Sequence, residues 1–405
     1  MSAATATPSQ ARPRPSTWSR TSTTGRALLT TVLATGVTTF MFLPLLALHL
    51  SAAGTPVGRV GLLIGLLSLC GQGFSVVSGL LVDRVGARAT TTAGFACRIA
   101  GYLLIAAGGP ALVPGIAAVG IGGSLLVLSV KARLVTEAAA HDDTRGMLAL
   151  RSTFGNVGVV LGPALGAVAY PFGFDAILGA AVLSHLVLGF HPTFLAKGEP
   201  AAPRPPHGAD RQPEPAPAPG SDRRGAAVLF AAAVAYWAIY SQLNSVIPLT
   251  AKALTGSTAA VSVVFTLNGA LVLLCQYTLL RRFLGHLPPR TLLATGFAAF
   301  ALAYLALLPH AGWLSLLVFT VPATLAEMLI GPSLDELAVT TAPRRRTGRA
   351  LGLLGLAGAV GSPLGAGLGT HLLQSLHGGP GLWLTITATA TLAAGACLLL
   401  PRTAR

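Results

Sequence analysis

Long apolar runs alternate with short polar breaks along nearly the whole chain. A helix needs about 20 mostly apolar residues to cross a bilayer. Twelve runs meet this requirement, so we expect twelve membrane-spanning helices. They are predicted at 27–50, 57–81, 89–109, 111–130, 152–170, 174–195, 226–250, 258–280, 291–309, 311–333, 350–373 and 380–400.

The longest interior break covers residues 197–225 and contains eight prolines and both signs of charge. This composition is typical of a flexible linker. It separates six predicted helices from six others, which favours an all-α membrane protein of two six-helix bundles. The predicted organisation is a disordered cytoplasmic tail, an N-terminal bundle, a cytoplasmic Pro-rich linker and a C-terminal bundle, at 1–25, 26–196, 197–225 and 226–405.

The composition agrees with a membrane location. Hydrophobic residues make up 53% of the chain and charged residues 10%, whereas about a quarter of a soluble protein is charged. The net charge of +15 does not indicate nucleic-acid binding, because the basic residues fall between apolar runs without interleaved aromatic residues. The four cysteines lack metal-ligand spacing, and no Gly-rich phosphate loop indicates an ATP-driven pump. No metal, nucleotide or other cofactor is implied.

The positions of Lys and Arg predict the orientation, since basic residues concentrate in cytoplasmic loops. With the N-terminus in the cytoplasm, all but three of the 27 basic residues fall in cytoplasmic tails and loops or at their borders. The exceptions are Arg59, Lys252 and Arg98. We therefore expect a multi-pass protein of the inner (plasma) membrane with both termini in the cytoplasm.

The turn after the second predicted helix carries the most informative motif. Its ten residues run from Gly79 to Arg88 and place Asp83, Arg84 and Gly86 between two apolar runs. They resemble the signature loop of the major facilitator superfamily. The resemblance implies a conformational latch of these five residues, in which Gly86 permits a tight turn and the acid lies against a helix start in the other half, where the helix dipole favours an anion. The alternative is that the charges only set topology.

A second segment that resembles a known transporter motif is found at 156–167, in the fifth predicted helix. It looks like the antiporter motif of drug:proton exporters, although Ala167 stands where a final glycine is usual. Glycines spaced by four share a helix face and let another helix approach closely, and a proline bends the helix. The resemblance implies a pliant hinge, with ordinary small-residue packing as the alternative, at Gly158, Gly162, Pro163 and Gly166.

Residues 240–248, 265–276 and 327–349 are also similar to bacterial multidrug exporters. One departure concerns the fourth helix, where many such exporters carry an arginine shortly before a Gly-rich stretch. The stretch is present at 120–123, but Ile116 occupies the place expected for the arginine.

The resemblance implies a secondary active transporter that works by alternating access. The expected function is export of small amphipathic molecules by proton antiport, with a small-molecule substrate, protons and the lipid bilayer as partners and a monomeric state. A proton-coupled importer of a metabolite or sugar is the alternative. A membrane receptor or an intramembrane enzyme is disfavoured, because the sequence shows no nucleophile–base pair and no appended sensory domain.

Glu327, Arg98 and His185 are the intramembrane ionisable candidates. A charge inside the bilayer costs at least about 2.5–3.5 kcal/mol and therefore often marks function. Glu327 and His185 are the candidates for proton coupling. The alternatives are a structural pair of Glu327 with an arginine from 344–349, and a hydrogen-bonded packing role for His185. Arg98 is expected to snorkel or to pair structurally.

Uncharged polar residues in apolar runs are candidates for a substrate cavity. Because the first, fourth, seventh and tenth helices usually form the cavity in this fold, Gln242, Asn244 and Asn268 are the preferred cavity residues. The alternative is helix–helix hydrogen bonding, worth about 0.6 kcal/mol a bond. Lys131 and Arg133 are expected to end the fourth helix and to set topology, and in the cavity they would favour an anionic substrate.

Overall fold

The computed structural model describes residues 18, 21–139, 144–195, 223–279, 284, 287–341 and 347–400. Every regular element in these ranges is a helix. Within the described ranges, ten helices are long and apolar enough to cross a membrane, and two shorter apolar helices accompany them. The predicted all-α membrane fold of twelve spans is confirmed. Most of the predicted tail and linker lies outside the described residues.

The helices divide between the two halves of the chain. Those of the N-terminal half are α2 (Thr23–Ala52), α3 (Val57–Ser68), α4 (Ser75–Val85), α5 (Ala87–Ala107), α6 (Leu112–Ala139), α7 (Thr144–Ala169), α8 (Phe174–Gly189) and α9 (Pro192–Leu195). Those of the C-terminal half are α10 (Arg223–Tyr240), α11 (Gln242–Thr255), α12 (Ala259–Thr278), α13 (Pro289–Leu305), α14 (Trp313–Thr341), α15 (Thr347–Ser375) and α16 (Pro380–Leu398).

The second and seventh predicted spans each consist of more than one helical segment. In the second, a π-helix at Leu69–Gly73 joins α3 to α4, and such segments are frequent at functional sites. In the seventh, α10 and α11 are separated at Ser241. The Ser241 hydroxyl and the Gln242 amide both donate to the Ala238 carbonyl, at 2.8 and 2.9 Å. They compete with the backbone for this acceptor, which favours a break in the helix.

Several other spans also differ from prediction at one end. α8 and α13 stop early, because His191 and Leu308 precede prolines and a residue before proline disfavours helical dihedrals. α6 continues through Lys131 and Arg133, and α7 already includes Arg151. The prediction that Lys131 and Arg133 end the fourth helix is therefore wrong. Both residue types form helices well, so a charge marks the end of an apolar run without ending the helix.

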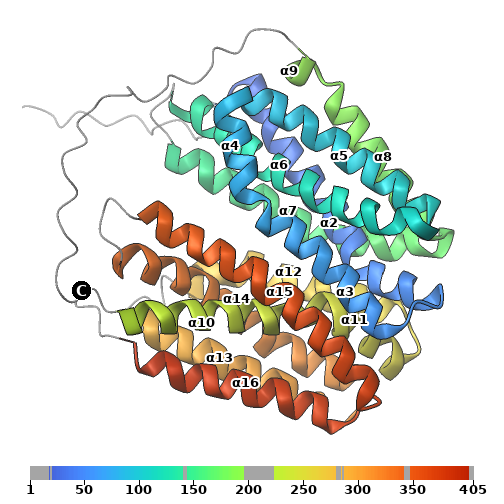
Figure 1. Ribbon diagram of the computed structural model, residues 1–405, viewed down its shortest axis with the longest axis vertical. Coiled ribbons are helices and arrows are strands. Elements are labelled where there is room, and N and C mark those ends of the chain that lie inside the picture. The colour runs from blue at the N-terminus through green and yellow to red at the C-terminus, as the bar shows by residue number, and fades with distance from the viewer. Residues whose placement is uncertain are drawn as a thin grey trace, which may run out of the picture.

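The two halves lie side by side and approach each other at one end of the molecule (Figure 1). α3 packs on α15, α11 packs on α2, and α7 packs on α12. At the other end, which carries the turn between α4 and α5, the halves lie farther apart (Figure 1). The charge pattern predicts that this separated end is cytoplasmic.

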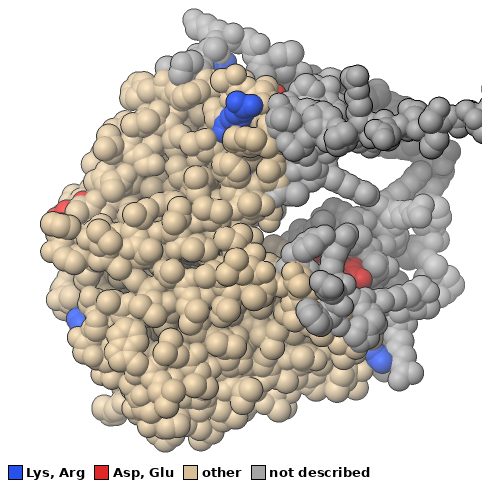
Figure 2. Space-filling model, turned by 180° about the vertical axis from the view of Figure 1, so that it is seen from behind, with Lys and Arg blue, Asp and Glu red and all other residues tan. Residues whose placement is uncertain are grey.

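The surface is that of a protein surrounded by lipid. Charged side chains on the face shown in Figure 2 appear near its margins, and the broad area between them is uncharged. Large apolar side chains such as Val168, Leu274 and Leu392 are mostly exposed. The buried core continues through both halves and includes Tyr102 and Trp383.

Candidate functional site: a central cavity and its charged residues

A cavity of about 750 Å³ lies mainly among the helices of the N-terminal half. α2, α6 and α7 line most of it, and Trp237 and Gly355 reach it from the C-terminal half. Its walls are mainly apolar and include Val32, Leu43 and Val127. Because both halves bound this cavity, a movement of one half against the other would change access to it.

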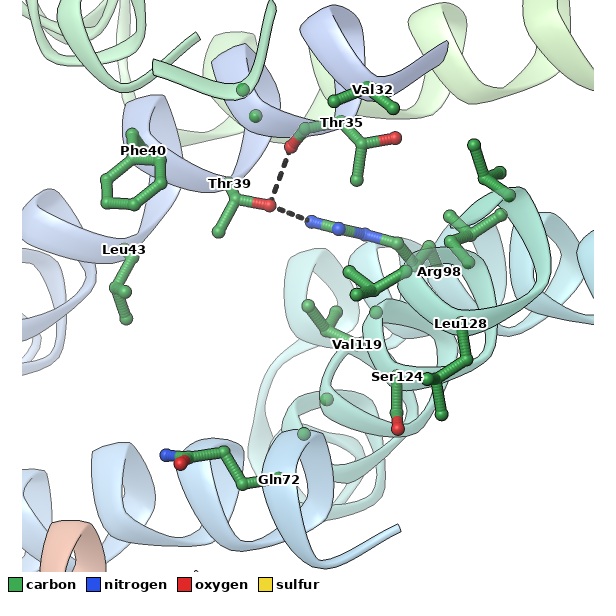
Figure 3. Close-up of a pocket in the computed structure, with 18 of the residues that line it drawn as sticks. Val32, Thr35, Thr39, Phe40, Leu43, Gln72, Arg98, Val119, Ser124 and Leu128 are labelled. Carbon is green, nitrogen blue, oxygen red and sulfur yellow. Dashed lines mark hydrogen bonds between the residues drawn. The ribbon is translucent and has the colours of Figure 1, made fainter. Parts of the chain in front are cut away.

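One wall of the cavity carries a row of threonines from α2. Thr31, Thr35 and Thr39 are spaced by four and therefore share one helix face. The Thr39 hydroxyl donates to the Thr35 carbonyl at 2.7 Å and accepts a hydrogen bond from Arg98 at 2.9 Å (Figure 3). The backbone of α2 thus orients this hydroxyl as an acceptor for a cation.

That cation, Arg98, lies near the middle of α5. It is roughly 16 Å along the helix from Ala87, at about 1.5 Å per residue, and it is 3% exposed. Its Nη2 donates to the hydroxyls of Thr39 and Tyr102, and its guanidinium lies 5.4 Å from the Tyr102 ring centroid. Its Nε has no hydrogen-bond partner among the described residues. Arg98 is expected from the sequence to snorkel or to pair structurally, and its place in the cavity lining was not predicted.

The Gly-rich stretch of α6 makes room for this side chain. A Cβ on Gly122 would lie 2.7 Å from the Arg98 Cγ, and one on Gly123 would lie 3.8 Å from its Nη1. The arginine that the resemblance leads one to expect on the fourth helix, at Ile116, is absent. A guanidinium from the neighbouring helix lies against the same stretch. The signal for this in the sequence was an arginine in one apolar run and a Gly-Gly pair in the next.

A second cation, Arg151, lines the cavity from α7. Its Nε likewise has no hydrogen-bond partner in the described part of the chain. Lys131, which sequence analysis considers for the same role, is exposed and is not among the described lining residues. The cavity therefore receives its positive charge from α5 and α7 and not from the end of the fourth span.

Gln72 closes the cavity where the two halves meet. It belongs to the π-helix, lines the cavity (Figure 3) and donates to the Ser362 hydroxyl at 3.1 Å. A Cβ on Gly358 would collide with the Gln72 amide and lie 3.1 Å from the Trp237 indole nitrogen. The second span and α15 are thus joined at the inner end of the cavity.

The proton-coupling candidate Glu327 lies in the C-terminal half, outside the described lining of the cavity. Tyr240 donates to its Oε1 at 3.2 Å, and Asn268 donates to its Oε2 at 2.9 Å. The rings of Tyr240 and Trp237 are in contact, with centroids 5.7 Å apart. Since Trp237 lines the cavity, its contact with Tyr240 connects the cavity wall to a hydrogen-bond partner of the Glu327 carboxylate.

The other predicted cavity residues lie elsewhere. Gln242, Asn244 and Asn268 are not among the described lining residues. Gln242 is buried and donates to the Gly365 carbonyl at 2.8 Å, which bonds α11 to α15. For Gln242 the alternative of helix–helix hydrogen bonding describes the structure. Whether a polar residue lines the cavity or bonds another helix depends on the side of its helix on which it lies relative to the neighbouring helices. Composition does not reveal this.

His185 packs behind the cavity, beside Arg98 and Tyr102. It is fully buried, its Nδ1 lies 2.7 Å from the Ala181 carbonyl oxygen, and its ring centroid lies 5.8 Å from that of Tyr102. This arrangement fits the packing alternative. The arginines at 344–346, named as alternative partners of the proton-coupling acid, lie outside the described residues.

The predicted latch lies at the end where the halves are farther apart. Asp83 and Arg84 are exposed at the C-terminal end of α4. Gly86 has a φ of 91°, which favours glycine. A Cβ on Gly79 would meet nothing within 4 Å. The acid is thus accessible to the other half, and its latch role stays a prediction.

Two arginines hold the short helix α9 against the N-terminal bundle. Arg88 donates from Nε and Nη2 to the Phe194 carbonyl at 3.0 and 2.9 Å. Arg133 donates to the Thr193 carbonyl at 3.2 Å and lies 5.1 Å from the Phe194 ring centroid. Arg88 therefore has a structural contact in addition to its predicted place in the latch.

The glycines of the predicted hinge face α2. A Cβ on Gly158 would lie 2.9 Å from the Gly36 Cα, and Cβ atoms on Gly162 and Gly166 would approach α2 to 2.7 and 2.9 Å. Pro163 lies inside the same helix. α7 and α2 are therefore in close backbone contact along this face, and the hinge role stays a prediction.

The C-terminal half contains an equivalent close approach of helices that was not predicted. Gly361, Gly365 and Gly369 of α15 are also spaced by four, with Pro363 between them, and Cβ atoms on them would collide with α10 and α11. α15 is the fifth span of its half, as α7 is of the first. The signal was a second set of glycines spaced by four, with a proline among them.

A comparison with known families decides the class of protein. The family model described as Major Facilitator Superfamily matches residues 28–279 and 227–405. The chain belongs to the major facilitator superfamily. It is therefore a multi-pass membrane transporter and not an enzyme, and the resemblance seen in the loop at 79–88 is confirmed.

Among curated relatives, this superfamily member is similar to "Multidrug resistance protein MdtH" of several bacteria. It is 29% identical to that of Aeromonas salmonicida over 256 residues, a match that spans 60% of each chain. It is 27% identical to that of Aeromonas hydrophila over 369 residues, or 86% of this chain and 87% of the relative. For Yersinia pestis the values are 26% over 337 residues and 80% of each chain.

Solved structures with the same fold include peptide transporters. A crystal structure of peptide transporter POT in complex with sulfate has a TM-score of 0.75 at 16% identity and 93% coverage of each chain. A POT family transporter in complex with 5-aminolevulinic acid has a TM-score of 0.74 at 14% identity, with 93% of this chain and 95% of that chain covered. At such identities the likeness concerns the fold alone.

Proposed function

We propose that this transporter exports small amphipathic molecules by proton antiport and alternating access. The observation that carries the proposal is the Glu327 carboxylate, held by Tyr240 and Asn268 next to a cavity that both halves bound. The distant similarity to MdtH multidrug resistance proteins supports export. The mainly apolar cavity walls support an amphipathic substrate.

Proton binding at Glu327 would act on the cavity through its hydrogen-bond partners. A carboxylate accepts stronger hydrogen bonds than a neutral carboxyl group, so protonation weakens the hold on Tyr240. Because Tyr240 contacts Trp237 in the cavity wall, a shift of this tyrosine reaches the bound substrate. Proton and substrate then favour different arrangements of α10 and α14, which is the coupling that antiport needs.

The contacts at the closed end define what must break in the opposite state. The Gln72 amide donates to Ser362 at 3.1 Å, and the Gly58 backbone N–H donates to the Gln374 side chain at 3.3 Å. Both bonds join the second span to α15. Breaking them while the Asp83 end closes would expose the cavity to the other side of the membrane.

Transport into everted membrane vesicles tests this proposal. When the vesicle interior is more acidic than the medium, vesicles containing the wild-type protein should accumulate amphipathic dyes. Glu327→Gln mimics the protonated side chain, so it should abolish gradient-driven accumulation and leave dye binding intact. Glu336→Gln, an exposed acid two turns later in the same helix, is the matched control and should transport normally.

Two outcomes would contradict the proposal. Gradient-driven uptake into right-side-out vesicles, without accumulation in everted ones, would establish the importer instead. Full pH-driven transport by Glu327→Gln would move the proton site to another residue.

A further inference from the structure

The charges lining the central cavity are unbalanced. Arg98 and Arg151 contribute two cations, and none of the described lining residues is acidic. In the low-dielectric interior of a membrane protein, ionisable side chains usually pair with one another or with backbone carbonyls. Among the described lining residues the two arginines therefore have no acidic partner, and this calls for an explanation.

Arg98 shows the imbalance most clearly. It is 3% exposed, its described hydrogen-bond partners are the neutral hydroxyls of Thr39 and Tyr102, and its Nε is left without a partner. Hydroxyl groups stabilise the guanidinium, but they do not neutralise it. A guanidinium presents a rigid fork of donors that fits a carboxylate in two parallel hydrogen bonds.

We propose that the cavity takes amphipathic organic carboxylates, with the acid group at Arg98 and the apolar body along the walls formed by α2 and α6. Arg151, near the N-terminal end of α7, meets the anion closer to the separated end of the two halves. The volume of about 750 Å³ is typical of sites for drug-sized ligands, which span about 300–1,000 Å³. This inference names the substrate class of the proposed exporter. The transport of the carboxylate rests on the proposed function, whereas its binding does not.

Binding measurements test the inference without any gradient. The full-length protein in phosphatidylcholine nanodiscs is titrated with three probes of one size: naphthoate, naphthamide and naphthylmethylammonium. Empty nanodiscs provide the background. Naphthoate should bind at least about tenfold more tightly than the other two, since a charge-assisted pair outweighs neutral contacts. Equal affinities, or a preference for the cation, would overturn the inference.

Variants assign the preference to the arginines. Arg98→Gln should remove most of the preference for naphthoate, and Arg98→Lys should keep part of it by retaining the charge. Arg151→Gln should weaken naphthoate binding less. Arg59→Gln, an exposed arginine away from the cavity, should bind as the wild type does. An undiminished preference in folded Arg98→Gln would overturn the assignment, and if that variant fails to fold, the probe comparison in the wild type and Arg151→Gln decides.

A repeat with phosphatidylglycerol nanodiscs identifies the source of the anion. Unchanged naphthoate affinity means a free carboxylate occupies the site, whereas competition by the anionic lipid means that a lipid headgroup shares it. These results are separate from the vesicle assay. Preferred naphthoate binding without proton-driven export would leave this inference standing and refute the exporter, and export of cationic dyes without naphthoate binding would do the reverse.

Discussion

Glycines on α7 determine how closely this helix approaches α2. At Gly158, Gly162 and Gly166 a Cβ would lie 2.7–2.9 Å from atoms of α2, closer than side chains normally pack. The same spacing in α15 places Gly361 and Gly365 against α10 and Gly369 against α11. Because these glycines lack a Cβ, the helices can approach closely in both halves.

In Gly162→Ala the new methyl group would lie 2.7 Å from the Phe40 Cβ and 2.8 Å from the Val37 carbonyl. Such overpacking typically costs about 1–3 kcal/mol, so the purified variant should unfold at a lower temperature than the wild type.

The control for this prediction is Gly179→Ala in α8, where nothing lies within 4 Å of the new methyl group. Alanine favours the helix by up to about 1 kcal/mol over glycine, so this variant should be as stable as the wild type or slightly more stable. Equal stability of the Gly162→Ala and Gly179→Ala variants would show that α2 yields without cost.

At the scale of elements, the turn between α4 and α5 lies at the end where the halves are farther apart (Figure 1). Its φ of 91° at Gly86 fixes the turn, Arg88 is bonded to the Phe194 carbonyl, and Asp83 is exposed. The backbone of the turn is thus anchored, and its acid is accessible to the other half.

Asp83→Asn keeps the size of this side chain and removes its charge. We expect normal insertion and at least about tenfold slower transport, because a loss of about 1.4 kcal/mol in one conformer shifts the populations tenfold. Initial rates in vesicles with equal amounts of protein measure this. Asp175→Asn, an exposed acid in the first turn of α8, is the matched control. Wild-type rates in both variants would mean that Asp83 only sets topology.

At the scale of the whole molecule, alternating access requires the end where the halves meet to open. Gly58 of α3 and Gln374 of α15 are hydrogen bonded there at 3.3 Å. In a variant without the four native cysteines, Gly58→Cys with Gln374→Cys and a short, reducible thiol crosslinker should stop transport. Reduction should restore it.

The single variant Gly58→Cys, treated in the same way, controls for modification of α3 alone and should transport throughout. Undiminished transport by fully crosslinked protein would show that this end does not need to open.

The orientation of the molecule is a separate prediction. Turns at residues 54, 257 and 377 lie at the end where the halves meet (Figure 1). Reporter fusions there should report the exterior, and fusions at 142, 210 and 346 should report the cytoplasm, because of the distribution of Lys and Arg. Reversal at two or more of these sites would refute the predicted topology.

The sequence by itself determined the number of spans, their approximate positions and the family. These features depend on local properties, since a run of apolar residues must cross the bilayer as a helix wherever it packs, and the loop from Gly79 to Arg88 is contiguous in the chain. Local chemistry also explains the early ends of α8 and α13 before prolines.

Only the tertiary structure decided which polar residues share a cavity. Arg98 and Arg151 lie 53 positions apart in sequence and line one space, whereas Gln242, a preferred cavity residue, bonds α15 instead. Periodicity fixes the angle between residues on one helix, but the rotation of that helix against its neighbours depends on packing along its whole length. The close approach that brings Arg98 over Gly122 is set by contacts between helices, and no single segment of the sequence contains it.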